Sequence, residues 1–314
     1  MARQIIINGV IVPEGANLEV SINSYRLPTR TFIDIPAHVY RAEKDGPVVL
    51  FMAGMHGDET NGIEIIRRLI REQYLSKLIC GTVIAIPIIN VVSFLYNSRE
   101  LPDGKDLNRL FPGTKSGSIG SRIAHDLVSE ILPMIDFGVD FHTGGAQITN
   151  YPQIRCVLND HDNLDIAKQF GAPFIINSPY RDKSFRKEAA KKGKSILVYE
   201  AGESFRINPL AIAEGVSGCL RLLQNLGMAN GVCSIQESKI LRDSSWLRSK
   251  SSGIFWSYKK YGSLVHKGES IGHVADPYGE TQQEIIAPSD GYIIGVNNRP
   301  IVNAGDALIH LGVM

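Results

Sequence analysis

Short, uninterrupted apolar runs that alternate with helical segments are the feature that most constrains the fold of this chain. Residues 47–53 contain no charged or hydrogen-bonding side chain, and from residue 60 to residue 73 apolar side chains recur every three or four positions. A strand that is apolar on both sides has to be buried on both faces, as in parallel sheets that helices cover. The same reasoning predicts strands near residues 47–53, 82–89, 137–142, 155–158, 173–177 and 195–200, and helices near residues 60–73, 119–132, 162–170 and 208–227. We therefore expect an α/β fold with helices on both faces of the sheet.

The character of the sequence changes near residue 46 and again near residue 231. Residues 1–45 suggest short strands and turns, and we expect them to form a small β element packed on the domain that follows. After residue 231 helical periodicity stops, and short strands separated by glycine turns take over. The predicted organisation is an N-terminal β element over residues 1–45, an α/β domain over residues 46–230 and a small C-terminal β domain over residues 231–314.

Two of the predicted strands end in side chains that are able to hold a metal ion. His56 and Glu59 lie in the turn after the strand near residues 47–53, and His142 ends the strand near residues 137–142. Open α/β sheets bind ligands in the crevice at the carboxyl ends of their strands. Two imidazoles and one carboxylate are the protein ligands of an open zinc site, which keeps its fourth position for water or substrate. Asp140 is a candidate to orient the His142 imidazole through its second nitrogen.

Other charged and polar side chains suit a hydrolytic site. Asn108 and Arg109 are adjacent in a polar loop, and a guanidinium binds a carboxylate through two parallel hydrogen bonds. Arg99 is a candidate for stabilising a developing oxyanion. Glu200 directly follows a mostly apolar strand and, beside a metal, would take a proton from water and give it to a leaving amine. The ordinary alternative for either arginine is a solvated surface charge, and for Glu200 an ion pair.

Together these residues resemble the succinylglutamate desuccinylase/aspartoacylase family, a branch of the zinc carboxypeptidase-like fold, and in particular its uncharacterised bacterial branch with proteins like N-acetyl-diaminobutyrate deacetylase. The resemblance covers residues 46–230 and implies that His56, Glu59 and His142 bind one zinc ion per chain. It also implies a carboxypeptidase-like mixed sheet flanked by helices. It rests on an ordered set of motifs: Gly54-x-His56-Gly57-x-Glu59, Arg99, Asp106-Leu107-Asn108-Arg109, His142 and Glu200.

By the same resemblance, Arg99 would polarise the substrate carbonyl, Asn108 and Arg109 would hold a substrate carboxylate, and Glu200 would be the general base. The stretch between Arg99 and Asn108 is longer than in aspartoacylase. Aspartoacylase also places a tyrosine, just before a proline, over its substrate, whereas the corresponding dipeptide here is Ala287-Pro288. The residue that replaces this tyrosine is not identified by the sequence, and the departure argues for a substrate other than N-acetylaspartate.

The C-terminal β domain resembles the barrel-sandwich hybrid of biotinyl and lipoyl carrier domains. Carrier domains modify a lysine at a hairpin tip, and this chain has no lysine after Lys267. We therefore expect a structural role, in which this domain walls the active site and restricts it to small substrates, as the family resemblance implies.

The sequence thus predicts a zinc-dependent deacylase that cleaves the amide bond of a small N-acyl amino acid or a related carboxylate-bearing compound. Two alternatives stay open. A metallocarboxypeptidase acting on short peptides would use the same residues and would differ in admitting longer chains. A metal-binding relative without catalytic activity would use the C-terminal domain to bind partners. The sequence names neither the acyl group nor the amine, and the ligand set also suits divalent ions other than zinc.

Composition argues against several other classes of protein. The net charge is +1, and the one basic stretch, residues 181–194, is typical of a solvated loop and helix face without the aromatic residues of a nucleic-acid site. No apolar stretch approaches the roughly 18 residues that a membrane span needs. We expect no nucleic-acid or membrane partner, a cytoplasmic location, and as a base-rate guess a homo-oligomer. The isolated cysteines, which suggest reduced and packed side chains, are Cys80, Cys156, Cys219 and Cys233.

Overall fold

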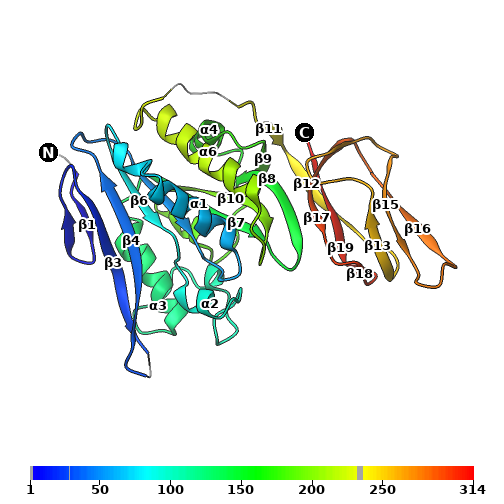
Figure 1. The fold of residues 1–314 in the computed structure, drawn as a ribbon, viewed down its shortest axis with the longest axis horizontal. Coiled ribbons are helices and arrows are strands. Elements are labelled where there is room, and N and C mark those ends of the chain that lie inside the picture. The colour runs from blue at the N-terminus through cyan, green and yellow to red at the C-terminus, as the bar shows by residue number, and fades with distance from the viewer. Residues whose placement is uncertain (1–2, 28, 232–235) are drawn as a thin grey trace.

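The computed structural model describes residues 3–27, 29–231 and 236–314, and one long mixed sheet runs through most of it (Figure 1). The middle of this sheet is parallel, because β5 (Val48–Ala53) lies between β6 (Thr82–Ile86) and β7 (Phe137–Gly144), and β10 (Ser195–Glu203) pairs with β7 on its other side. All residues of β5, β6 and β7 are buried. The uninterrupted apolar runs therefore predicted these strands correctly.

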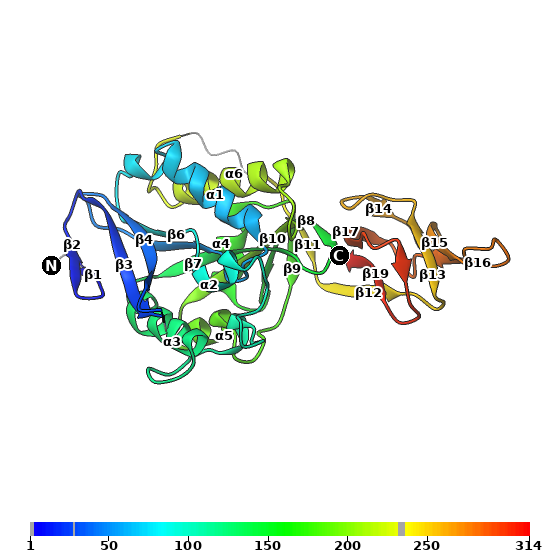
Figure 2. The ribbon, with the colours of Figure 1, turned by 60° about the horizontal axis from the view of Figure 1, so that its bottom comes forward.

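Helices cover both faces of this parallel core (Figure 2). Side chains of α1, α4 and α6 belong to the core on one face, and those of α2, α3 and α5 belong to the core on the other. The long helices lie close to their predicted positions, and α3 continues into a π-helical turn over Leu127–Ile131. The helices are α1 (Thr60–Arg71), α2 (Val91–Leu95), α3 (Ile119–Asp126), α4 (His161–Phe170), α5 (Phe185–Lys191) and α6 (Pro209–Asn225).

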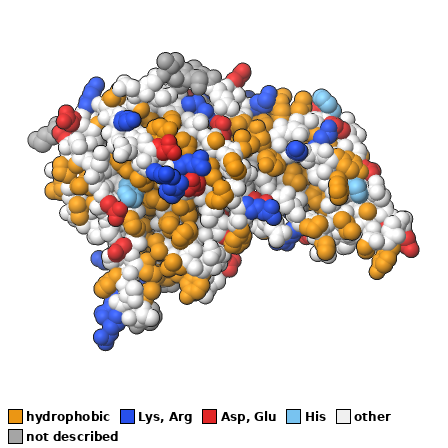
Figure 3. Space-filling view, in the orientation of Figure 1, with side chains coloured by type: hydrophobic (Ala, Val, Ile, Leu, Met, Phe, Trp, Pro, Cys, Tyr) orange, Lys and Arg blue, Asp and Glu red, His pale blue; other side chains and the backbone are white. Residues whose placement is uncertain are grey.

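Helix α1 illustrates how the sequence produces this layer. Within its apolar stripe, Ile66 and Leu69 are fully buried against the sheet. On the solvent side Glu64 forms ion pairs with Arg67 and Arg68, one turn along the helix. Figure 3 shows acidic and basic side chains gathered over this part of the surface. The amphipathic pattern thus places α1 firmly on the sheet and positions the turn that precedes it.

The N-terminal strands are longer than the sequence suggested. We expected short strands in residues 1–45, but β3 (Asn17–Arg26) and β4 (Phe32–Arg41) have ten residues each, and β4 pairs with β6 of the main sheet. Buried and more exposed residues alternate along much of both strands, so polar side chains interrupt the apolar pattern that would have revealed their length. Two short strands, β1 (Ile5–Ile7) and β2 (Val10–Val12), form a separate hairpin.

Strand β8 (Ile148–Cys156) also begins earlier than predicted, because the sequence suggested a strand only near residues 155–158. Its first half contains polar side chains, among them Thr149 and Asn150, that interrupt any apolar run. They are nevertheless buried, since β8 lies between β10 and β17 (Gly291–Asn297). Through this pairing the C-terminal part of the chain joins the same sheet as the α/β core.

The described residues from 236 to 314 form only strands and turns, as predicted, and most of them project from one end of the molecule (Figure 2). Strands β12 and β19 continue the main sheet beyond β17, while β13, β15, β16 and β18 form a second sheet. The remaining strands are β9 (Phe174–Asn177), β11 (Lys239–Leu241), β12 (Asp243–Arg248), β13 (Gly253–Ser257), β14 (Leu264–Val265), β15 (Ser270–Ala275), β16 (Gln282–Ile286), β18 (Ile301–Val302) and β19 (Ala307–Val313).

The expected fold class, a mixed α/β sheet flanked by helices and followed by a small β part, is confirmed. Within the described part of the chain, no helix has both the length and the apolar character that crossing a bilayer requires. Cys80, Cys156 and Cys219 form no disulfide, whereas Cys233 lies outside the described residues.

Candidate metal centre and active-site pocket

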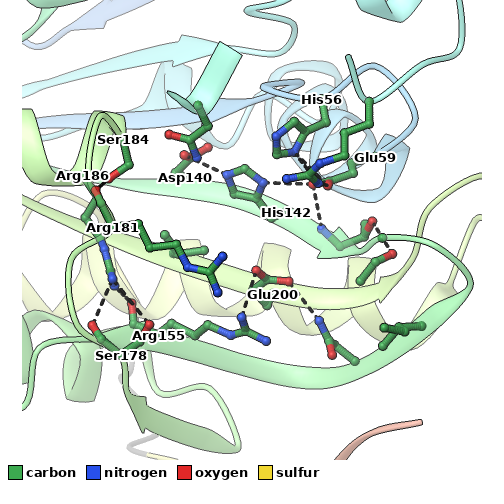
Figure 4. A pocket seen from close by; sticks show the side chains of 18 of the residues that line it. His56, Glu59, Asp140, His142, Arg155, Ser178, Arg181, Ser184, Arg186 and Glu200 are labelled. Atoms are coloured by element: carbon green, nitrogen blue, oxygen red, sulfur yellow. Dashed lines mark hydrogen bonds and ion pairs between the residues drawn. The ribbon is translucent and has the colours of Figure 1, made fainter. Parts of the chain in front are cut away.

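A cavity of about 360 Å³ opens at the carboxyl ends of the parallel strands (Figure 4). This is the edge at which ligand sites form in α/β sheets. Every residue that the sequence predicted for the site lines this cavity, namely His56, Glu59, Arg99, Asn108, Arg109, His142 and Glu200. The fold therefore brings together side chains that lie far apart along the chain.

Three of these side chains converge closely enough to share a metal ion. The Nδ1 atom of His56 is 2.8 Å from Oε1 of Glu59, and the Nδ1 atom of His142 is 2.9 Å from Oε2 of the same carboxylate. One donor atom from each residue lies within 4.8 Å of the others, and all three residues are buried. This is the group that the sequence predicted, and its donors are two imidazole nitrogens and a carboxylate oxygen.

The turn between β5 and α1 presents His56 and Glu59 because glycines allow an unusually tight path. Gly54 has a φ of +65°, in the left-handed region that favours glycine. A side chain on Gly57 would overlap the carbonyl group of Ser93. Glu59 occupies the N-cap position of α1 without capping it. Its carboxylate is directed to the imidazoles instead, so one short turn supplies two of the three donors.

The outer nitrogen of each imidazole faces a second carboxylate. Nε2 of His56 is 3.0 Å from Oδ1 of Asp106, and Nε2 of His142 is 2.9 Å from Oδ2 of Asp140, although this second pair lacks hydrogen-bond alignment. Metal-binding histidines commonly have such a partner, which fixes the ring and leaves the inner nitrogen free to coordinate. Asp140 lies where the sequence suggested, whereas no role for Asp106 was evident from the sequence.

The electrostatics of the cluster favour positive charge at its centre. Burial alone would raise the pKa of Glu59, but the two imidazoles outweigh it and hold that pKa well below its usual value. Burial would lower the pKa of His142, yet Asp140 and Glu59 raise it well above the ordinary value. Glu59 and Asp106 likewise raise the pKa of His56 against the effect of burial. Two imidazoles and the Glu59 carboxylate, with Asp106 and Asp140 behind the imidazoles, thus form a donor set that fits a divalent cation.

Arg99 lies directly against this group. Its Nη1 atom is 3.1 Å from Oε1 of Glu59 and 3.3 Å from Nδ1 of His56, and its Nη2 donates to Oδ2 of Asp106 at 3.0 Å. The side chain is 41% exposed, so it also borders the open cavity. A role in polarising a substrate carbonyl stays a prediction, and the position of Arg99 beside the candidate ligands is compatible with it.

Asn108 and Arg109 lie in a short 3-10 helix, η2 (Leu107–Arg109), at the rim of the cavity. Asp106 caps this turn by accepting a hydrogen bond of 2.8 Å from the backbone N–H of Asn108. Oδ1 of Asn108 accepts a bond of 3.0 Å from the backbone N–H of Phe185, which fastens the turn to the start of α5. Arg109 donates to the Asn108 carbonyl at 2.6 Å. The two predicted carboxylate-binding residues are therefore held in place by the backbone around them.

Glu200 is the direct neighbour of His142, because the two residues are register partners in the parallel pair β10 and β7. Both oxygens of its carboxylate have a partner. Asn150 donates its Nδ2–H to Oε2 at 2.9 Å, and Nη1 of Arg155 lies 3.5 Å from Oε1. The sequence singled out neither Asn150 nor Arg155. Asn150 lies in the polar first half of β8, which carried no strand signal, and Arg155 lies in the predicted strand near residues 155–158 without any motif that marks it.

The basic stretch over residues 181–194 is not entirely a solvated face: that expectation was wrong for Arg186, whereas Arg181 is exposed, as expected. Arg186 is buried, and its guanidinium donates to the backbone carbonyls of Arg155, Ser178 and Pro179. Arg181 extends into the cavity (Figure 4), and its guanidinium has no hydrogen bond or ion pair within the described residues. No signal in the sequence distinguished these arginines from their solvated neighbours.

The C-terminal part contributes Trp246 of β12 to the cavity wall. The ring of Trp246 stacks on the imidazole of His310 in β19, with centroids 4.6 Å apart and planes 12° from parallel. Ala287, which the resemblance set against the aspartoacylase tyrosine, is buried in the core of the C-terminal part and does not line the cavity. An aromatic side chain is thus present at the site, but it comes from a different position in the chain.

Comparison with known proteins points in the same direction as this geometry. A model of the succinylglutamate desuccinylase/aspartoacylase catalytic domain matches residues 45–226, which is more than half of the chain. The N-alpha-acetyl-L-2,4-diaminobutyric acid deacetylase of Halomonas elongata is 29% identical over 279 residues, which cover 84% of this chain and 81% of that protein.

Solved structures share the fold over almost the whole chain. The product-bound ectoine utilisation protein EutE (DoeB) of Ruegeria pomeroyi matches with a TM-score of 0.83 and 24% identity, and the match covers 95% of each chain. A succinylglutamate desuccinylase/aspartoacylase of Rhodobacter sphaeroides matches with a TM-score of 0.82 and 26% identity, covering 96% of this chain and 97% of the other. The likeness includes the N-terminal and C-terminal β parts and confirms the carboxypeptidase-like fold.

Proposed function

Because this chain belongs to the succinylglutamate desuccinylase/aspartoacylase family, we propose that it is a zinc-dependent deacylase that hydrolyses the amide bond of a small N-acyl amino acid or a related carboxylate-bearing compound. One observation carries the proposal. The group of His56, Glu59 and His142 lies in the same cavity as Glu200, which is the register partner of His142. A set of metal donors and a carboxylate next to it are what metal-assisted hydrolysis needs.

The residues around the cavity divide the reaction between them. Bound zinc would supply the Lewis acidity that makes water nucleophilic near neutral pH. Glu200 accepts a proton from the water that attacks the acyl carbonyl, and it later donates that proton to the nitrogen of the departing amine. The C–N bond breaks, and the products are a carboxylic acid and an amine. Arg99 stabilises the negative charge that develops on the carbonyl oxygen.

The positively charged side chains that line the cavity suit a substrate with a carboxylate. Asn108 and Arg109 form the pair that would hold this group, since guanidinium and carboxylate match each other in shape and charge. Arg181 adds a guanidinium without a protein partner among the described residues. A volume of about 360 Å³ lies near the lower end of ordinary ligand sites, which favours a small substrate over a peptide.

The experiment that tests this proposal pairs metal analysis with a hydrolysis screen. Purified protein is assayed for bound metal, and N-acetyl, N-succinyl and N-formyl amino acids are offered with peptides as controls. The panel includes N-alpha-acetyl-L-2,4-diaminobutyric acid, which the name of the Halomonas relative suggests. We expect about one zinc ion per chain and cleavage of a small N-acyl compound.

Two outcomes would contradict the proposal. Cleavage confined to peptides would favour a metallocarboxypeptidase, which uses the same donors. An absence of both bound metal and activity after zinc is added back would favour a non-catalytic relative.

A further inference from the structure

The carboxylate of Glu200 is held from β8, not from its own strand. Asn150 donates to Oε2, and Arg155 lies beside Oε1, as Figure 4 shows for Arg155. Asn150 is buried and only 3% exposed. Because a carboxylate only accepts hydrogen bonds, the donor end of the Asn150 amide has to face Glu200.

The other end of the same amide lies against the C-terminal part of the chain. In the antiparallel pair of β8 and β17, Asn150 is the register partner of Gly295. A Cβ atom on Gly295 would be 2.8 Å from Oδ1 of Asn150, which is too close for two non-bonded atoms. This oxygen is buried and has no hydrogen-bond partner among the described residues. The absent side chain of Gly295 is therefore what leaves room for the amide.

A second contact fastens β17 beside the general base. Nδ2 of Asn298, just after β17, donates to Oγ1 of Thr149 and to Oε2 of Glu203, both at 2.6 Å. Thr149 in turn donates to the same carboxylate oxygen of Glu203 at 2.9 Å. Glu203 is buried and ends β10, three residues after Glu200. The strand that carries Glu200 is thus tied to β8 and to the C-terminal part at its functional end.

We propose that Asn150 is a positioning residue for Glu200, and that β17 sets the orientation of Asn150 through Gly295. The C-terminal part then does more than border the cavity, because it helps to position a side chain of the active site. This inference rests on the proposed function, because it gives Glu200 the role of general base. A catalytic carboxylate loses rate when its oxygens are free to rotate, since proton transfer depends on alignment.

The test compares three variants of the full-length, metal-loaded protein. Asn150→Ala removes the donor, Gly295→Ala pushes on the amide from β17, and the third variant carries both changes. We expect each single variant to lower kcat about 10- to 100-fold at nearly unchanged KM and metal content. The double variant should be no slower than the slower single variant, because both changes disturb one contact.

A matched control separates positioning from general loss of stability. Val296→Ala changes the next residue of β17, whose side chain packs in the core of the C-terminal part. It should lower Tm by at least as much as Gly295→Ala while kcat stays near that of the wild type. Equal losses of kcat in Val296→Ala and Gly295→Ala would overturn the role of β17. Wild-type kcat in Asn150→Ala would overturn the role of Asn150.

Crystal structures of the same variants distinguish a failure of this inference from a failure of the proposed function. We expect the Glu200 carboxylate to turn away from its wild-type position in Asn150→Ala and in Gly295→Ala, but not in Val296→Ala. An unmoved carboxylate in the first two variants would refute the positioning role whether or not the protein is active. An inactive wild type with a displaced carboxylate in those variants would refute the proposed function alone.

Discussion

Nε2 of His56 lies 3.0 Å from Oδ1 of Asp106, a residue fifty positions later in the chain. This contact orients the imidazole so that its Nδ1 faces Glu59. Asp106 also accepts hydrogen bonds from the Asn108 backbone and from Arg99. One carboxylate therefore connects a candidate metal ligand, the proposed carboxylate-binding turn and the proposed oxyanion partner. Its interactions explain why burial does not raise the pKa of Asp106, which is instead held well below its usual value.

Asp106→Ala should weaken zinc binding about 10- to 100-fold, because the His56 ring loses the partner that fixes its orientation. The measurement is a competition titration with a chelator of known zinc affinity. Asp103→Ala in the same loop is the matched control, since Asp103 pairs with Lys105 away from the metal group. Equal zinc affinity in the two variants would show that Asp106 does not orient His56 for metal binding.

Replacing the proposed general base and replacing a candidate ligand should have different effects on bound metal. Glu200→Gln should retain zinc and lose most of kcat, on the order of 10²-fold or more, because an amide cannot accept the proton of the attacking water. His56→Ala should lose both zinc and activity, since one of three protein donors is gone. Metal analysis of the same samples used for kinetics checks this. Substantial turnover by Glu200→Gln would remove Glu200 from the mechanism.

Arg181→Gln should raise KM for a carboxylate-bearing substrate about 10-fold or more while changing kcat little. The reason is that Arg181 extends into the cavity and its guanidinium has no partner in the described part of the chain, and a charged hydrogen bond to substrate is worth roughly 1.5–3 kcal/mol. Lys183→Gln removes the same charge from the same loop at an exposed residue that does not line the cavity, and it should leave KM unchanged. A similar KM in both variants would argue against contact between Arg181 and substrate.

His310 should make the protein less stable as pH falls through the range just below neutrality. Burial, with a smaller effect of Arg155, lowers the pKa of His310 to about 3. In the unfolded chain a histidine titrates near 6.5, so below that pH only the unfolded state binds the proton. The linkage removes about 2 kcal/mol of unfolding free energy between pH 7 and pH 5.

His310→Phe tests this dependence because it keeps an aromatic ring against Trp246 and removes the titrating group. Chemical denaturation of the metal-free wild type and of the variant, each at pH 7 and at pH 5, gives the unfolding free energy that each protein loses over this interval. The variant should lose about 2 kcal/mol less than the wild type over this interval. Identical losses in the two proteins would mean that His310 is not buried in its neutral form.

Local patterns in the sequence were sufficient to predict those parts of the site that lie within short segments of the chain. His56 and Glu59 are three residues apart in one glycine-rich turn, and His142 ends an apolar strand. Both signals depend on neighbours in the chain, as does the burial of β5 and β7. The fold class followed from the same alternation of apolar strands and helices.

Contacts between segments that are distant along the chain could not be predicted from such patterns. Asn150 and Glu200 are fifty residues apart, and Gly295 is far from both along the chain. Arg181 and Arg186 have neighbours of the same composition, so only their packing shows that they line the cavity.

By itself, the sequence determined which strands are buried, which turns carry the candidate metal donors and which family the chain resembles, because periodicity and motif spacing are properties of neighbouring residues. Only the tertiary structure decided the order of the strands in the sheet. That order decides which polar side chains are buried next to each other. Asn150 interrupts an apolar run and so concealed its strand, yet the sheet places it between Glu200 and Gly295. A polar group is buried where the fold supplies its partner, and that partner is fixed by packing across the chain.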